Sequence, residues 1–258
     1  MKLYFNYFKM HLQSSMEHKM SFFLTMLAQL LVSFNSFLGL YFLFSRFHSI
    51  KGYTFYEILL LQGVVSMQFA LAEWFVRGFD SFASIIGNGE FDRIMVRPRS
   101  LVLQVLGSRI EFSRVGKVVQ GVVMLGFGIK KSGIVWTLDK VFLMIGMIIS
   151  GIVIFSCVFL VYASICFFTT EGLEVVNLLT NGVQEHGKYP LDIFGKKVMI
   201  FCTFVIPYAL SLYYPFLYLT EREYNKIFLL FPVLACVVIV PSYWLWKVGV
   251  GHYKSTGS

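Results

Sequence analysis

Residues 141–168 read VFLMIGMIISGIVIFSCVFLVYASICFF and contain no charged side chain. About 20 apolar residues are enough for an α-helix to cross the hydrocarbon core of a bilayer. This stretch is longer, so it predicts a transmembrane helix that is tilted or protrudes from the membrane. The rest of the chain has the same character, because 57% of its 258 residues are hydrophobic and only 14% are charged. A soluble protein of this length could not bury so much apolar surface, and we therefore expect an all-α integral membrane protein.

Five other apolar segments are long enough to cross a bilayer. The predicted spans are, in chain order, residues 21–44, 56–75, 115–135, 141–168, 197–219 and 227–246. The sequence therefore predicts six transmembrane helices in a single transmembrane domain that covers residues 1–258.

Lysine and arginine residues are concentrated in alternate connecting segments. If the N-terminus is cytoplasmic, roughly two thirds of the 22 lysines and arginines lie on the cytoplasmic side, as the positive-inside rule favours. We therefore expect both termini in the cytoplasm, together with residues 78–114 between spans 2 and 3. The same bias explains the net charge of +8, so this charge does not indicate a nucleic-acid partner.

The first 20 residues precede span 1 and carry Phe5, Phe8, Leu12 and Met16 at helical spacing. This pattern predicts an amphipathic helix over residues 1–20 that lies in the membrane interface. The alternative is a simple extension of span 1 into the headgroup region.

Residues 87–100, GNGEFDRIMVRPRS, form a dense polar and charged island between spans 2 and 3. Gly89 allows a sharp turn, and Pro98 ends a helical turn. Asp92 and Arg97 could pair within the loop or with a partner, and Phe91 could serve as an apolar anchor. The island has no nucleophile–base pair and no metal ligands, which indicates a contact surface rather than an active site. The alternative is a solvated basic loop against lipid headgroups.

Polar residues are rare within the predicted spans. Gln29, Ser33 and Asn35 in span 1 could line a polar path or form hydrogen bonds between helices. Glu57 and Glu73 lie near the two ends of span 2, where we expect their side chains to reach water. The central parts of spans 4, 5 and 6 contain no charged residue, which argues against an ion-coupled carrier with a buried carboxylate.

Two prolines, Pro207 and Pro215, interrupt the helical pattern of span 5. Each removes a backbone hydrogen-bond donor, which is tolerated in a membrane only where other groups satisfy the freed carbonyls. The segment could be a broken, partly re-entrant helix or a span with proline kinks.

The sequence contains no motif for catalysis or metal binding. It has no G-x-x-x-x-G-K-[ST] phosphate loop, so we do not expect the chain to hydrolyse ATP. The histidines are scattered, and the four cysteines lie inside apolar runs without paired spacing. We therefore expect no catalytic residue, no metal site and no cofactor bound by this chain.

Two segments carry a resemblance to a known family. Residues 89–100 fit the pattern G-x-[FL]-D-x-x-[LIM]-x-R-P-x-S. Residues 189–194, YPLDIF, precede span 5, which then contains the prolines at 207 and 215. Together with six spans, these features resemble the permease subunit of type-2 ABC exporters, in the branch similar to daunorubicin-resistance and related antibiotic-export permeases. The resemblance covers essentially the whole chain, although the segment 169–197 shows no family motif at its start and could form a second cytoplasmic contact.

The resemblance implies that a separate ABC ATPase, expected in two copies, binds ATP and magnesium. Two permease subunits, identical or homologous, would form the path for an amphipathic compound, a peptide or a lipid-like cargo in a bacterial plasma membrane. In that family the loop between spans 2 and 3 carries the coupling helix. The candidate coupling residues are therefore Gly89, Phe91, Asp92, Arg97 and Pro98.

Two other functions are compatible with the sequence. A secondary transporter or channel would transport by itself, driven by an ion gradient. A non-transporting immunity subunit would bind a toxic compound without raising the hydrolysis rate of any ATPase.

Overall fold

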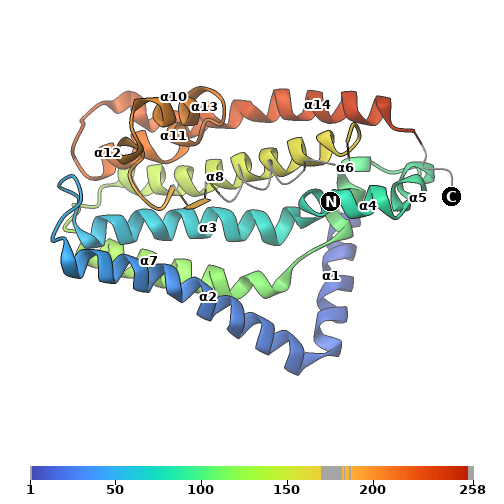
Figure 1. The fold of residues 1–258 in the computed structure, drawn as a ribbon, viewed down its shortest axis with the longest axis horizontal. Coiled ribbons are helices and arrows are strands. Elements are labelled where there is room, and N and C mark those ends of the chain that lie inside the picture. The colour runs from blue at the N-terminus through green and yellow to red at the C-terminus, as the bar shows by residue number, and fades with distance from the viewer. Residues whose placement is uncertain (1, 170–181, 183, 186, 255–258) are drawn as a thin grey trace.

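The structure is a computed structural model that describes residues 2–169, 182, 184, 185 and 187–254. Within these residues the regular structure is helical, apart from one isolated bridge between Ile50 and Tyr53. The long helices run side by side along the length of the molecule (Figure 1). They are α2 (Lys19–Arg46), α3 (Phe55–Asp80), α7 (Val115–Lys131), α8 (Leu138–Ile165) and α14 (Ile239–His252).

Shorter helices lie at the two ends of the bundle and beside it (Figure 1). They are α1 (Lys2–Glu17), α4 (Phe82–Gly87), α5 (Glu90–Val96), α6 (Leu101–Ser108), α10 (Lys196–Phe204), α11 (Tyr208–Ser211), α12 (Tyr213–Leu219) and α13 (Phe231–Ala235). The described residues also include four 3₁₀ turns: η1 (Phe112–Arg114), η2 (Leu191–Phe194), η3 (Lys226–Leu229) and η4 (Cys236–Val238).

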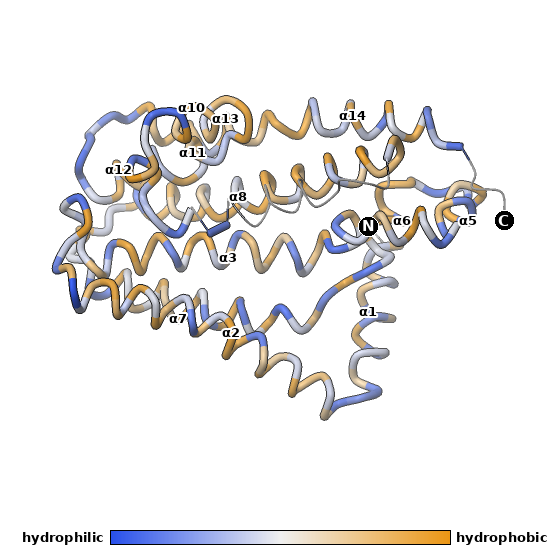
Figure 2. The backbone as a smooth tube through the Cα atoms, in the orientation of Figure 1, coloured by the Kyte–Doolittle hydropathy of each residue, from blue (hydrophilic) through white to orange (hydrophobic). Residues whose placement is uncertain are grey.

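Five of the described helices are long and apolar enough to cross a membrane, and a sixth is added if one bent pair counts as a single span. The all-helical integral membrane fold predicted from the sequence is thus confirmed. Hydropathy follows the same plan, because most hydrophilic residues lie near the ends of the long helices (Figure 2).

Helix α3 is the central element of the bundle and packs against both α7 and α8. In the apolar 18-residue stretch of the span Phe55–Gly87, which begins with α3, 72% is buried inside the protein. In the corresponding stretch of α2 only 11% is buried. Close approach of α3 and α7 requires glycine, since a Cβ atom at Gly128 would lie 2.8 Å from the Cα atom of Leu60. Helix α2 instead exposes most of its apolar side chains, as a helix in contact with lipid would.

Helix α1 is separate from α2, because the helical run breaks at His18 and the two helices diverge (Figure 1). Tyr4 donates a hydrogen bond to the backbone oxygen of Phe75 over 3.0 Å, and the ring of Phe8 stacks on that of Phe75. The apolar face predicted from the sequence is therefore divided, since Phe8 packs against the protein whereas the side chain of Phe5 is 69% exposed. That α1 lies in the membrane interface stays a prediction.

Span 5 is broken rather than continuous. Helix α10 meets the α11–α12 pair at an angle of 84°, and Pro207 is the last residue before α11. Pro215 lies inside α12 and is buried, so it does not mark the break itself. Tyr208 follows the break and is fully buried. Its hydroxyl donates to Oε1 of Gln68 in α3 over 3.1 Å, which fixes the broken helix to the core.

Candidate functional site

The polar island folds into a compact set of short helices that begins where α3 ends. Helix α4 follows α3 after Ser81, and Gly89 then starts α5 with a φ of +67°, a conformation that favours glycine. Helix α5 ends at Val96, and Arg97 is extended with φ −78° and ψ 130°, as a residue before proline prefers. The shaping roles predicted for Gly89 and Pro98 fit this local geometry.

Phe91, expected above as a possible apolar anchor, lies inside the protein in this conformation. Its side chain is 0% exposed. The ring contacts those of Phe82, Phe167 and Tyr253 at centroid distances of 5.3, 5.2 and 4.8 Å. Phe91 therefore fixes α5 against the end of the bundle instead of offering a surface to a partner.

Asp92 connects α5 with the C-terminal end of the described chain. The hydroxyl of Tyr253 donates to Oδ1 of Asp92 over 3.0 Å. Burial, followed by this hydrogen bond, raises the pKa of Tyr253, so the phenol remains a hydrogen-bond donor to a higher pH than an exposed tyrosine would. Because Tyr253 also packs on Phe91, the two neighbouring residues hold α5 through the same tyrosine.

The end of α5 projects as an exposed tip. Gln104 fixes the turn behind it, because its Nε2 atom donates to the backbone oxygens of Ile94 and Arg99, each over 3.2 Å. The side chain of Val96 is 84% exposed, and Arg97 and Pro98 next to it are exposed as well. The exposed tip, residues 95–99, thus presents the apolar side chains of Met95 and Val96 beside two arginines.

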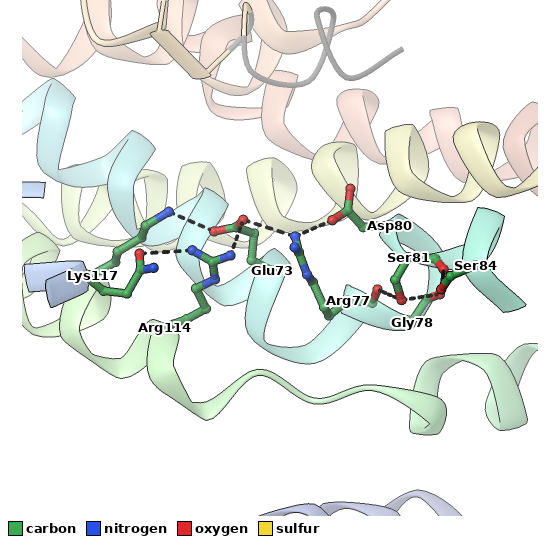
Figure 3. Close-up of polar contacts among 9 residues, drawn as sticks. Glu73, Arg77, Gly78, Asp80, Ser81, Ser84, Arg114 and Lys117 are labelled. Atoms are coloured by element: carbon green, nitrogen blue, oxygen red, sulfur yellow. Dashed lines mark hydrogen bonds and ion pairs between the residues drawn. The ribbon is translucent and has the colours of Figure 1, made fainter. Parts of the chain in front are cut away.

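A buried charge network lies at the end of α3, where it meets η1 and the first turn of α7 (Figure 3). Glu73, 5% exposed, receives Nη2 of Arg114 at 3.2 Å and Nζ of Lys117 at 3.0 Å. Arg77 lies 3.4 Å from the same carboxylate and also pairs with Asp80. Two carboxylates therefore neutralise most of the charge of three cations at the end of α3 that leads into α4.

The prediction that Glu57 and Glu73 reach water is wrong. Glu57 is 8% exposed; its carboxylate caps α3 by accepting from the backbone N–H of Thr54 and lies 3.5 Å from Arg222. Both glutamates are paired inside the protein because charged side chains in a membrane bundle need partners. The spacing of Glu73 and Arg77, four residues apart on a helix, was the sequence signal that could have indicated the network.

The three polar residues of span 1 differ in their surroundings. Gln29 bonds between helices, since its Oε1 atom accepts from Nη1 of Arg114 over 3.1 Å. Ser33 also takes part in a hydrogen bond between helices, but through its backbone oxygen, which accepts from Nε2 of Gln120 over 2.7 Å. Asn35 is exposed on the outer face of α2. The structure therefore does not bring the three side chains together as the lining of one path.

Neither metal-binding nor disulfide chemistry is apparent in the described part of the chain. No three His, Cys, Asp or Glu side chains lie close enough together there to hold a metal ion. The four cysteines are free thiols. The segment 169–197 was considered above as a second cytoplasmic contact, and its residues 170–181, 183 and 186 lie outside the described residues.

These features define an integral membrane protein whose long helices end in a small helical structure with an exposed basic tip. A model of the ABC-2 family of transporter proteins matches residues 30–257. The chain belongs to this family, which makes it the membrane component of an ABC transporter and implies an ABC ATPase as its partner. No curated protein matches the chain, and no solved structure matches it.

Proposed function

We propose that the chain is the permease subunit of an ATP-driven exporter and that residues 78–114 couple it to the ATPase. The observation that carries this proposal is the exposed tip, residues 95–99, held by buried Phe91 and by Asp92 at the end of the transmembrane bundle. A rigidly supported tip can transmit a displacement of the ATPase to α3, because its base rests on the bundle core.

The position of the chain ends supports the proposed orientation. Tyr4 bonds to Phe75, and Tyr253 bonds to Asp92, so both described ends of the chain lie near the same end of the bundle as α5. In the proposal this end is cytoplasmic, in the plasma membrane of a bacterial cell. A second permease subunit, identical or homologous, and two ATPase copies complete the transporter.

The cargo in this proposal is an amphipathic compound, a peptide or a lipid-like molecule, and antibiotic export belongs to this class. ATP and magnesium are held by the partner. The chain itself supplies the path and the coupling contact, without a catalytic residue.

Reconstitution tests the proposal. Proteoliposomes would contain the chain with its ABC ATPase partner, and accumulation of a fluorescent amphipathic dye would be followed after ATP addition. We expect accumulation only when ATPase, ATP and magnesium are all present, because the chain has no phosphate loop.

Proteoliposomes with the chain alone and an imposed proton or sodium gradient form the matched control. Transport in this control would support a secondary transporter and contradict the proposal. Dye binding without transport or stimulated ATP hydrolysis in the complete system would support the immunity subunit instead.

A further inference from the structure

A groove of about 370 Å³ lies between α2, α3 and α7. This volume is within the range of sites that bind small molecules. One wall is aromatic, because Phe34 stacks on Phe37, and Phe37 and Tyr41 both contact Phe55. Val123 and Phe127 of α7 form the opposite wall, with side chains 50% and 53% exposed, so the groove is open toward the surroundings of the bundle.

The groove carries a polar group at each end. Gln120 is 8% exposed and closes one end, where its Nε2 atom donates to the backbone oxygen of Ser33. Lys131 lies at the other end, with its Nζ atom 5.5 Å from the centre of the Tyr56 ring. In the part of the chain that the structure describes, no carboxylate forms an ion pair with Lys131.

The length of the groove matches the depth of one leaflet. At 1.5 Å per helical residue, Gln120 and Lys131 are about 16 Å apart along α7. The hydrocarbon layer of one leaflet is about 15 Å deep, which is half of the bilayer core. With Lys131 at the level of the headgroups, Gln120 therefore lies near the middle of the membrane.

We infer that the groove binds one acyl chain of an anionic phospholipid, with the phosphate beside Lys131. The aromatic wall and the side chains of α7 that line the groove offer the acyl chain van der Waals packing. The ammonium group of Lys131 has no carboxylate partner among the described residues, so it favours a lipid with net negative charge over a neutral one. The lipid comes from the leaflet at the C-terminal end of α7, and this assignment does not depend on which leaflet is cytoplasmic.

The full chain in nanodiscs of phosphatidylcholine with added phosphatidylglycerol tests the inference. After release from the nanodisc, native mass spectrometry counts the phosphatidylglycerol molecules that each chain retains. We expect one per chain for the unaltered protein and about fivefold less retention for Lys131→Gln, the size of effect that one lysine has on an anionic lipid. The matched control is Lys130→Gln, because Lys130 is adjacent but does not line the groove.

A second pair of variants tests the groove itself. Val123→Trp fills the groove, and we expect it to abolish retention. Val122→Trp has nearly the same starting exposure, 53%, and lies outside the groove, so we expect retention as in the unaltered protein. Melting temperatures verify that both variants fold. If Val123→Trp does not fold, the comparison of Lys131→Gln with Lys130→Gln alone tests the inference.

Three results would overturn the inference. Equal losses for Lys131→Gln and Lys130→Gln would mean a general attraction of lipid to the helix end. Equal retention of phosphatidylcholine would mean that the charge is not recognised. Conversion of a dimer into a monomer by Val123→Trp, without loss of phosphatidylglycerol, would mean that a second copy of the chain covers the groove.

Discussion

At the scale of single residues, the charges at the end of α3 set the strongest constraint. Glu73 contacts Arg77, Arg114 and Lys117 while its side chain is only 7% exposed. Isolated charges cannot stay buried without partners, so this carboxylate holds three cations in place. The network joins α3, which leads into the exposed tip, to the first turns of α7.

Replacing Glu73 by Gln leaves Asp80 as the one remaining carboxylate of the network. We expect Glu73→Gln to reduce the free energy of unfolding by about 3–5 kcal/mol, the usual cost of removing one partner from a buried ion pair. Thermal unfolding of the purified chain in detergent measures this. Glu90→Gln is the matched control, because Glu90 is exposed at the start of α5. Equal melting temperatures for the two variants would show that the network contributes little.

Roles that depend on the backbone preferences of a single residue could be predicted from the sequence, whereas roles that depend on contacts between distant residues could not. The left-handed turn at Gly89 and the end of α5 before Pro98 follow from the backbone preferences of glycine and proline. The burial of Phe91 does not, because the rings that cover it include Phe167 and Tyr253, which are distant in the sequence. In our proposal the apolar contact with the partner is made by exposed Val96 instead of buried Phe91. No sequence pattern had indicated Val96 for this contact.

At the scale of elements, close packing of α6 against α3 supports the tip. A Cβ atom at Gly78 would lie 1.8 Å from the backbone oxygen of Val105, so no side chain fits there without moving α6. Gly126 in α7 has nothing within 4 Å of the corresponding position.

Gly78→Ala and Gly126→Ala therefore form a matched pair. We expect Gly78→Ala to destabilise the protein by about 1–3 kcal/mol or more, as overpacking does, and to lower the yield of folded protein. Gly126→Ala should leave both unchanged. Melting temperatures and size-exclusion profiles measure the difference; similar values for the two variants would mean that α6 does not rest on α3 as described.

Hydropathy located the elements well, because a span must be long and apolar wherever it packs. The predicted span of residues 141–168 corresponds to α8, Leu138–Ile165, and that of residues 115–135 corresponds to α7, Val115–Lys131. Span 5 differs from the continuous helix that its length suggested. Its two parts meet at 84°, next to Pro207 and to Tyr208, whose hydroxyl bonds to Gln68. The prolines indicated a break, but its angle depends on contacts with α3 that no local pattern contains.

At the scale of the whole molecule, the proposed coupling to an ATPase requires the exposed tip to be cytoplasmic. Single cysteines introduced into a cysteine-free version of the chain test this. Arg97→Cys should react with a membrane-impermeant maleimide only after cells are permeabilised, whereas Lys226→Cys, in the turn before α13, should react in intact cells. The reverse pattern would contradict the proposed orientation.

In our proposal the exposed tip couples the permease to its ATPase. The most direct measurement is the affinity of the purified permease for the ATPase, together with the ATP hydrolysis that the permease stimulates. Arg97→Ala should weaken binding by about tenfold or more, since arginine is among the residues that dominate such contacts. Val96→Asp should have an effect of at least that size, because it buries an unpaired carboxylate in the contact. Arg46→Ala, an exposed arginine at the end of α2, should behave as the unaltered chain. Unchanged affinity and unchanged stimulated hydrolysis in Val96→Asp and Arg97→Ala would contradict the claim.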